Sequence, residues 1–122
     1  MSAPTPLAHR VDGEGEPLLL LNGGMMSLTA WDPYVPELAG RYRVVRCDLR
    51  GMLRSPGTPP PTLAGHAEDL VRLLDDLGVA RCHVAGTSYG AFAALHLAAL
   101  ATSRVASLVA MTVADRVSPE MW

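Results

Sequence analysis

Apolar and polar positions along this chain follow two alternating patterns: short apolar runs, and longer stretches with helical spacing. The short runs end at turn residues such as Asp12-Gly13 and Asn22-Gly23-Gly24, which is typical of strands. They predict strands at residues 7–12, 18–21, 42–47, 81–85 and 104–111. The run at 18–21 consists of leucine alone. An apolar run without polar positions indicates a central strand, buried on both faces of a parallel sheet.

Longer stretches predict helices between these strands. Residues 63–77 carry apolar side chains at helical spacing, with Thr62 as the expected N-cap and Gly78 as the stop. Residues 89–100 are almost wholly apolar, and residues 31–39 are expected to be helical despite Pro33 and Pro36, because proline is tolerated in a first turn. The outer face of the 63–77 helix is expected to be solvated and carries Glu68, Asp69, Arg72, Asp75 and Asp76.

Strands that alternate with helices predict βαβ units joined by right-handed crossovers. The expected fold class is therefore α/β, a mostly parallel sheet with helices on both faces. The 122 residues are 49% apolar and 18% charged, which indicates one small globular domain. No internal repeat or linker divides residues 1–122, so we expect a single domain.

Charge, cysteine usage and glycine spacing disfavour several classes of function. A formal net charge of −2 provides no basic surface for nucleic acid or an anionic membrane, and favours a small-molecule substrate. Cys47 and Cys82 lie far apart without CxxC spacing, so we expect two buried thiols and neither a disulfide nor a zinc site. The Gly13-Glu14-Gly15 segment lacks the third glycine and the helix start of a dinucleotide site. We expect neither a cofactor nor a metal.

Membrane and export signals are also missing from the sequence. Residues 1–6 have neither the basic segment nor the apolar run of a signal peptide. The most apolar stretch, residues 91–101, is interrupted by His96 and is too short to span a bilayer. We therefore expect a cytoplasmic protein that is not attached to a membrane.

The sharpest chemical signal is the GxSxG pattern of residues 86–90, which lies where a predicted strand meets a predicted helix. A serine on such a tight turn is held above the sheet, and Gly86 and Gly90 let the backbone bend that sharply. Ser88 would also lie at a helix N-terminus, where the helix dipole favours the negative charge that develops during acyl transfer. The pattern in this context predicts a nucleophilic serine.

Three segments together resemble the α/β-hydrolase family, and the resemblance covers the whole chain. Residues 18–24 (LLLLNGG) resemble the family's strand and oxyanion loop, and residues 48–55 (DLRGMLRS) resemble its DxRGxGxS segment. Residues 86–90 match its nucleophile elbow, and the spacing among the three segments is also the family's. The resemblance implies a partial hydrolase core with about strands 2–6 of the usual eight.

By this resemblance, the protein is an esterase-like serine hydrolase with Ser88 as its nucleophile and a small ester-like molecule as its substrate. The backbone N–H groups of Gly24 and Tyr89 would form the oxyanion hole, with Met25 as the alternative second donor. Elementary chemistry agrees, because a tetrahedral intermediate needs two preorganised donors on one side.

The chain departs from the family pattern at two positions. Asn22 stands where the family usually has histidine, so the hydrogen bonds inside the oxyanion loop are expected to differ. Leu53 stands where glycine is usual, which makes the local backbone conformation an open question. We expect Asp48 and Arg50, from the same segment as Leu53, to tie loops together rather than to act in catalysis.

The histidine that would activate the serine is missing from the expected place. A serine hydroxyl needs a positioned base, which this family supplies from a histidine late in the chain. After Ser88 the only histidine is His96, eight residues along the same helix, where we expect it to be embedded and out of reach. The other histidines, His9, His66 and His83, precede the elbow and have no role in the resemblance.

The last residues leave the triad acid open. Asp115 is one candidate, although a surface-loop role is favoured, and residues 115–122 are expected to begin the lid segment. Because family members are about twice as long, we expect this chain to be the N-terminal half of a hydrolase, inactive as it stands. The alternative is a non-catalytic fragment or interaction module. The apolar strand at 104–111 would then be a sheet edge, which predicts self-association or complementation by the missing C-terminal half.

Overall fold

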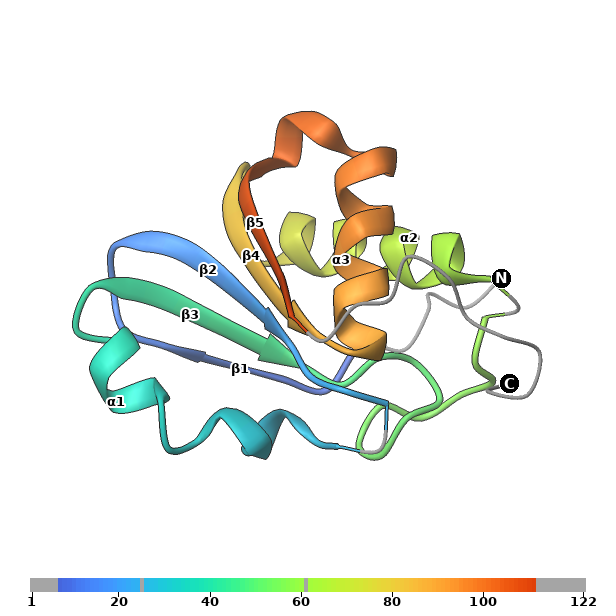
Figure 1. The fold of residues 1–122 in the computed structure, drawn as a ribbon, viewed down its shortest axis with the longest axis horizontal. Helices are drawn as coiled ribbons and strands as arrows, with labels where there is room; N and C mark the ends of the chain where they lie inside the picture. Colours follow the sequence, from blue (N-terminus) through green and yellow to red (C-terminus); the bar gives the residue numbers. More distant parts are fainter. Residues whose placement is uncertain (1–6, 25, 61, 112–122) are drawn as a thin grey trace.

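A single twisted sheet organises the computed structural model, which describes residues 7–24, 26–60 and 62–111 (Figure 1). The sheet order is β1-β3-β2-β4-β5. Strand β1 is antiparallel to β3, and the remaining neighbours are parallel, so the predicted mostly parallel sheet is confirmed. The strands are β1 (His9–Asp12), β2 (Glu16–Leu21), β3 (Tyr42–Cys47), β4 (Cys82–Thr87) and β5 (Val105–Met111).

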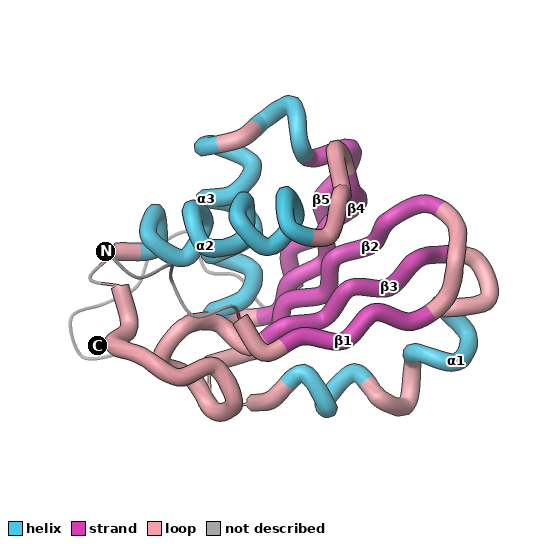
Figure 2. The backbone as a smooth tube through the Cα atoms, turned by 180° about the vertical axis from the view of Figure 1, so that it is seen from behind, coloured by secondary structure: helices cyan, strands magenta, loops and turns pink. Residues whose placement is uncertain are grey.

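Helices cover both faces of this sheet, as the sequence predicts. Helices α2 (Leu63–Asp76) and α3 (Tyr89–Leu100) lie side by side on one face, and the short helix α1 (Val35–Leu38) lies on the other (Figure 2). Two 3-10 helices, η1 (Leu28–Trp31) and η2 (Thr102–Arg104), precede α1 and β5. Among the described residues, no helix is both long and apolar enough to cross a membrane.

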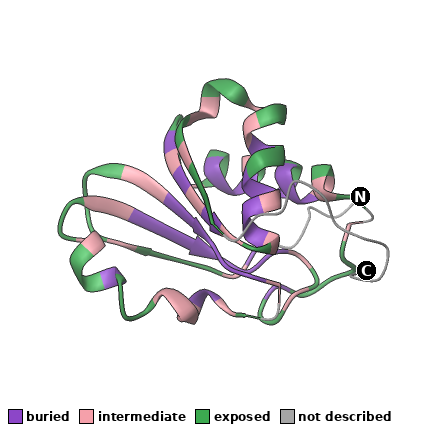
Figure 3. Cartoon of the chain, in the orientation of Figure 1, coloured by how far each residue is buried: buried purple, intermediate pink, exposed green. Residues whose placement is uncertain are grey.

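The main core lies between the sheet and the pair α2–α3, where most of the buried residues gather (Figure 3). Alternate positions of β2, including Leu19 and Leu21, point to this side, because successive side chains of a strand face opposite ways. Leu70 and Leu74 of α2 and Leu97 of α3 are fully buried against them. This packing holds the N-terminus of α3 close to the end of β4, which α3 follows directly in the chain.

The predicted boundaries of α2 and α3 agree closely with the structure, whereas the helix expected at residues 31–39 does not form as one element. The Thr62 side chain caps α2 by accepting a hydrogen bond from the Gly65 N–H at 3.3 Å. The 31–39 segment is divided into η1 and α1, with Asp32 ending the first and Pro36 in the first turn of the second. Proline lacks an N–H and cannot continue a helix, so Pro33 separates the two pieces.

The expected burial is wrong at two polar positions. Asp69, expected on a solvated face, is only 7% exposed, because it bonds Arg50 at 2.9 Å and Arg72 at 2.6 Å. His96, expected to be embedded in an apolar helix, is exposed on α3, with its Nδ1 at 2.9 Å from the Phe92 carbonyl oxygen. An almost wholly apolar helix has no polar face to mark its solvent side, which is why the sequence misplaces His96.

Candidate active site

The backbone bends sharply at Ser88, between the end of β4 and the start of α3. Ser88 has φ 53° and ψ −120°, a conformation that residues other than glycine rarely adopt. Its N–H donates to the Met111 carbonyl at 2.9 Å, which anchors the bend to the end of β5. The residue is exposed, so the predicted bend and the predicted exposure of the serine are both present.

Gly86 and Gly90 lie where backbones approach too closely for a side chain. A Cβ on Gly86 would lie 2.5 Å from the Gly90 carbonyl oxygen, and a Cβ on Gly90 would lie 2.6 Å from that of Asn22. Real Cβ atoms essentially never come this close to another heavy atom. These two glycines therefore allow the bend at Ser88 to pack directly on the end of β2.

The glycine loop after β2 lies against this bend. A Cβ placed on Gly23 would be 3.8 Å from the Cβ of Ser88, and one on Gly24 would be 3.6 Å from that of Tyr89. Segments 64 or more residues apart in the sequence thus meet at the expected place. Met25, the alternative oxyanion donor, lies outside the described residues, as do Asp115 and the expected lid segment at 115–122.

Asn22 braces the glycine loop from inside. Its Nδ2 donates to the Met26 carbonyl at 2.6 Å, and the Met26 N–H donates to the Gly23 carbonyl at 3.1 Å. Asn22 is 8% exposed, and its Oδ1 has no partner among the described residues. The loop that the resemblance assigns to oxyanion binding is therefore held by an amide where histidine is usual.

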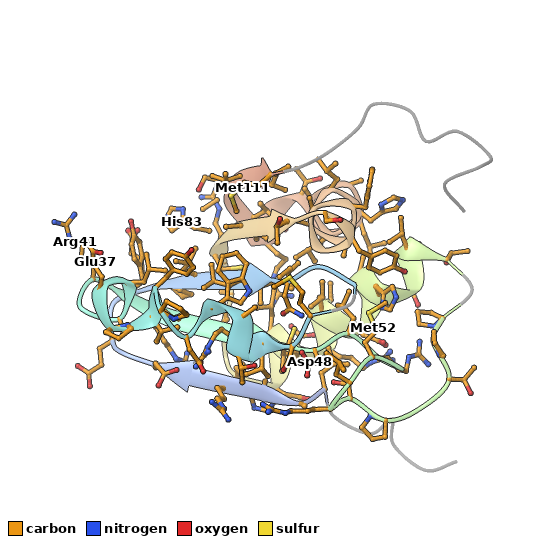
Figure 4. The ribbon with its side chains drawn as sticks, turned by 60° about the horizontal axis from the view of Figure 1, so that its bottom comes forward. Glu37, Arg41, Asp48, Met52, His83 and Met111 are labelled. Carbon is orange, nitrogen blue, oxygen red and sulfur yellow. The ribbon has the colours of Figure 1, made fainter. Side chains whose placement is uncertain are left out.

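Asp48, labelled in Figure 4, follows β3 and connects it to two other segments of the chain. This fully buried carboxylate accepts hydrogen bonds from the Leu28 N–H at 2.8 Å and the Arg54 N–H at 3.3 Å, while the Ser55 hydroxyl donates to its carbonyl at 2.5 Å. Asp48 thus ties loops together as expected, whereas Arg50 links the same segment to Asp69 of helix α2.

Leu53, which stands where the family usually has glycine, adopts a backbone conformation that favours glycine. Its φ is 40°, in the left-handed region that favours glycine. The side chain is 63% exposed. The segment thus keeps a glycine-like backbone with a leucine in it, and the strain is local because the side chain points into solvent.

His66 is the residue near the site that sequence reasoning missed. It is fully buried on α2, and its ring meets that of Tyr89 edge to face, with centroids 5.5 Å apart. Neither ring nitrogen has a hydrogen-bond partner among the described residues, and burial lowers the pKa of His66. The burial of His66 could have been predicted, because residue 66 lies three positions after Leu63 and four before Leu70, on the apolar stripe of the helix.

No described histidine is hydrogen-bonded to the Ser88 hydroxyl. His9 contacts the Leu7 carbonyl oxygen, His83 contacts Ser107 and Glu16, His96 contacts a carbonyl of its own helix, and both nitrogens of His66 are without partners. The described part of the chain also has no group of three or more His, Cys, Asp or Glu side chains that could hold a metal ion. Within the described residues, Ser88 therefore has no hydrogen-bonded histidine that could act as its base.

This arrangement agrees with a family-level comparison. Residues 16–121 match the sequence profile of the family described as alpha/beta hydrolase fold. The chain belongs to the α/β-hydrolase fold family. Its mostly parallel sheet with helices is accordingly the α/β fold that the resemblance implies.

Relatives and solved structures support the same family. RutD of Caulobacter vibrioides, named for an inferred carbamate hydrolase activity, is 38% identical over 110 residues, which are 88% of this chain and 41% of RutD. The pimeloyl-[acyl-carrier protein] methyl ester esterase of Aeromonas hydrophila is 37% identical over 99 residues, 80% of this chain and 37% of that enzyme. A hydrolase structure from Pseudomonas aeruginosa superposes with a TM-score of 0.87 at 38% identity, covering 93% of this chain and 44% of that one. The chain thus spans less than half the length of these proteins.

Proposed function

We propose that this chain carries the nucleophile of a serine hydrolase that acts on ester or related acyl bonds, with Ser88 as the attacking residue. The observation that carries the proposal is the backbone of Ser88. Holding a serine at φ 53° in an exposed bend is costly, and such strain persists where function requires a group to be held in place. The bend lies at the N-terminus of α3, where the Ser88 side chain makes no capping hydrogen bond and is exposed.

The oxyanion hole in this proposal consists of the Gly24 and Tyr89 backbone N–H groups, with Met25 as the alternative to Gly24. Two observations support it: the glycine loop packs on the elbow, and no described backbone carbonyl accepts a hydrogen bond from either N–H. The Ser88 N–H is already bonded to Met111, which leaves the next N–H along the chain as the donor. Donors fixed in this way stabilise the oxyanion without reorganising.

The reaction would proceed by acyl transfer. The base takes the proton of the Ser88 hydroxyl as the Ser88 oxygen attacks the substrate carbonyl carbon, and the carbonyl oxygen takes the negative charge. When this intermediate collapses, the bond from the carbonyl carbon to the alcohol oxygen breaks, and the alcohol leaves with the proton from the base. Water, deprotonated by the same base, then attacks the acyl-enzyme carbonyl carbon, the bond to the Ser88 oxygen breaks, and Ser88 takes the proton back as the carboxylic acid is released. The base and the acid that orients it would come from polypeptide beyond the described residues, and Asp115 is retained only as a minor candidate for the acid.

The names of the relatives suggest the substrate class. One is named for carbamate hydrolysis and another for cleavage of a methyl ester. Both substrates have a carbonyl bonded to a heteroatom that can leave, which is what a serine nucleophile and an oxyanion hole accommodate. A small ester-like or carbamate-like molecule is therefore the proposed substrate.

The test is a chimera in which this chain replaces the matched region of Caulobacter RutD, assayed with p-nitrophenyl acetate. Ser88→Ala should lower kcat by about 10³-fold or more, because removing one member of a catalytic serine system costs at least this much. Ser103→Ala, an exposed serine of η2, is the matched control and should keep full activity. An active chimera whose turnover is unchanged by Ser88→Ala would contradict the proposed role.

The second candidate is a non-catalytic module, and the absence of a histidine bonded to the Ser88 hydroxyl in the described residues favours it for the isolated chain. A serine without a base is a weak nucleophile. The 122-residue chain should therefore show no burst with p-nitrophenyl acetate, whereas a stoichiometric burst would mean that the chain alone completes the site.

A further inference from the structure

The imidazole of His66 is fully buried on α2, although neither of its ring nitrogens has a hydrogen-bond partner among the described residues. A buried polar atom without a partner costs free energy that an apolar side chain at the same position would avoid. Such an atom in a folded core therefore calls for an explanation. The ring of His66 contacts that of Tyr89, the residue that follows Ser88, so the explanation is sought at the bend between β4 and α3.

The Tyr89 side chain contacts both His66 and the glycine loop after β2. The rings of His66 and Tyr89 meet edge to face, with centroids 5.5 Å apart and planes at 67° to 90° of one another in the T-shaped class, here 87°. Such a pair is directional, because the positive edge of one ring faces the negative face of the other. A Cβ placed on Gly24 would be 3.6 Å from the Cβ of Tyr89 and 3.8 Å from its Cγ. One side chain thus connects the buried histidine to both residues whose backbone N–H groups are the proposed oxyanion donors.

Helix α2 holds His66 in place from both sides. The Asp69 carboxylate, three residues further along the helix, binds the Arg50 guanidinium at 2.9 Å and so ties α2 to the loop after β3. In the first turn, a Cβ on Gly65 would collide with the side chain of Pro60, so the helix packs tightly on the segment before it. His66 lies between these two contacts. Its ring therefore cannot withdraw from the ring of its partner unless this part of α2 moves.

Both rings of the pair are uncharged at pH 8. Burial lowers the pKa of His66, the Asp69 carboxylate opposes this shift, and the Arg50 guanidinium adds to it. Burial also raises the pKa of the Tyr89 phenol. The contact therefore depends on the shape of the two rings and on their quadrupoles, and not on an ionic attraction.

We propose that His66 is a positioning residue for the oxyanion hole: its ring fixes the Tyr89 side chain and thereby holds the Tyr89 N–H at a constant separation from the Gly24 N–H. The side chain and the N–H of Tyr89 share one Cα atom, so a displaced ring also displaces the donor. Donors stabilise an oxyanion best when they are preorganised, and a misplacement of about 1 Å can lower a rate by about 10²-fold. The inference rests on the proposed function, because it requires the Tyr89 N–H to bind an oxyanion.

The kinetic test uses the RutD chimera with p-nitrophenyl acetate at pH 8. His66→Leu keeps an apolar group in the core and removes the ring. It should lower kcat by about tenfold and change KM by less than about twofold, because the donors act mainly in the transition state. His66→Phe restores an aromatic edge and should bring kcat back to within about threefold of the unmodified chimera.

Leu74→Val is the matched control, because Leu74 is also fully buried on α2. It lies eight residues beyond His66, about 12 Å along the helix, so it changes the core without touching the aromatic pair. This variant should keep the kcat of the unmodified chimera. Circular dichroism checks that each variant is folded.

A second measurement does not depend on catalysis. In the 122-residue chain, NMR relaxation gives the order parameter of the Tyr89 N–H, which should be about 0.85, as in rigid backbone. His66→Leu should lower this order parameter by about 0.1 or more, and His66→Phe should restore it. Leu74→Val should leave it unchanged. This measurement decides the question even if the chimera is inactive.

Four results would overturn the inference. They are an unchanged kcat for His66→Leu in a chimera that Ser88→Ala inactivates, a folded His66→Phe variant as slow as His66→Leu, an equal loss of kcat in Leu74→Val, and an unchanged order parameter at Tyr89. Turnover that survives Ser88→Ala would instead contradict the proposed function, and this inference with it. The two failures are therefore distinguishable.

Discussion

Among the residues that the structure describes, two have a positive φ without being glycine, Ser88 and Leu53. At Ser88 the strained conformation holds a hydroxyl at the bend between β4 and α3, whereas at Leu53 it holds an exposed apolar side chain. The physical cost is the same in kind, a clash between Cβ and the backbone of about 1–2 kcal/mol. The strain at Leu53 should therefore be removable without loss of function.

Leu53→Gly should raise the free energy of unfolding by about 0.5–1 kcal/mol. Relief of the left-handed strain contributes about 1–2 kcal/mol, and the greater freedom of glycine in the unfolded chain offsets about 0.4–1 kcal/mol. Urea denaturation followed by circular dichroism measures the difference. Leu95→Gly, on the exposed side of α3, is the matched control and should lower stability by about 1 kcal/mol. Destabilisation by both changes would show that Leu53 is unstrained in solution.

At the scale of single residues, the sequence predicted conformations that a short segment determines. It did not predict burial that depends on contacts with distant parts of the chain. The bend at Ser88 and its flanking glycines could be predicted because a GxSxG turn has few alternatives. Asp69 could not be placed, because its burial depends on Arg50, which reaches it from a loop 19 residues earlier. Whether Ser88 is the nucleophile remains a prediction.

At the scale of elements, α2 and α3 meet beside the elbow through His66 and Tyr89. Burial is the main cause that lowers the pKa of His66, the Asp69 carboxylate opposes it, and the Arg50 guanidinium adds to it. A histidine whose pKa is lower in the folded state binds fewer protons there than in the unfolded chain. Its contribution to stability is therefore present above the unfolded pKa, near 6.5, and is lost as the pH falls toward the folded value.

His66→Leu should accordingly flatten the pH dependence of stability between pH 7 and 5, and its advantage over the unmodified protein should grow as the pH falls. Urea midpoints measured at half-unit pH intervals test this. His96→Leu is the control, because His96 is exposed on the neighbouring helix, and it should leave the slope unchanged. Parallel profiles for His66→Leu and the unmodified protein would mean that His66 finds a polar partner in solution.

The local sequence predicted where a helix begins and ends more reliably than whether a stretch forms one continuous helix. The cap at Thr62 and the stop at Gly78, with φ 70°, are local signals, and α2 lies between them. The expected helix at 31–39 fails because Pro33 and Pro36 cannot both lie in one first turn. A helix of four residues such as α1 depends on its contact with β3, which periodicity does not report.

At the scale of the whole molecule, the alternation of strands and helices was enough to predict a mostly parallel α/β sheet, and the resemblance supplied its strand set. An apolar groove on the sheet face opposite α2 and α3 could not be predicted, because the broken helix segment forms one of its walls and its floor combines β2, β4 and β5. Within the described residues, the sheet order agrees with the expectation of an edge at β5, and the consequence of this edge for association remains a prediction.

The reactivity of the two cysteines depends on the whole fold, because both lie in the core between the sheet and the helices α2 and α3. Cys47 and Cys82 are each 1% exposed. Burial raises the pKa of the Cys47 thiol to about 12, with a smaller contribution from Asp48, and raises that of Cys82 to about 11 against the opposing charge of Arg104. The thiolate is the reactive form, so neither thiol should react in the folded protein at pH 8.

Native protein mixed with Ellman's reagent at pH 8 should therefore show no fast phase, and both thiols should react together at the rate of global unfolding. In 6–8 M urea two thiols per chain should react at once, because unfolding exposes them and restores ordinary acidity. Ser103→Cys, on the exposed η2 turn, supplies the positive control and should add one fast equivalent without changing the slow phase. A fast native phase at Cys82 alone would mean that the start of β4 opens separately from the rest of the sheet, and that the described core is not one cooperative unit.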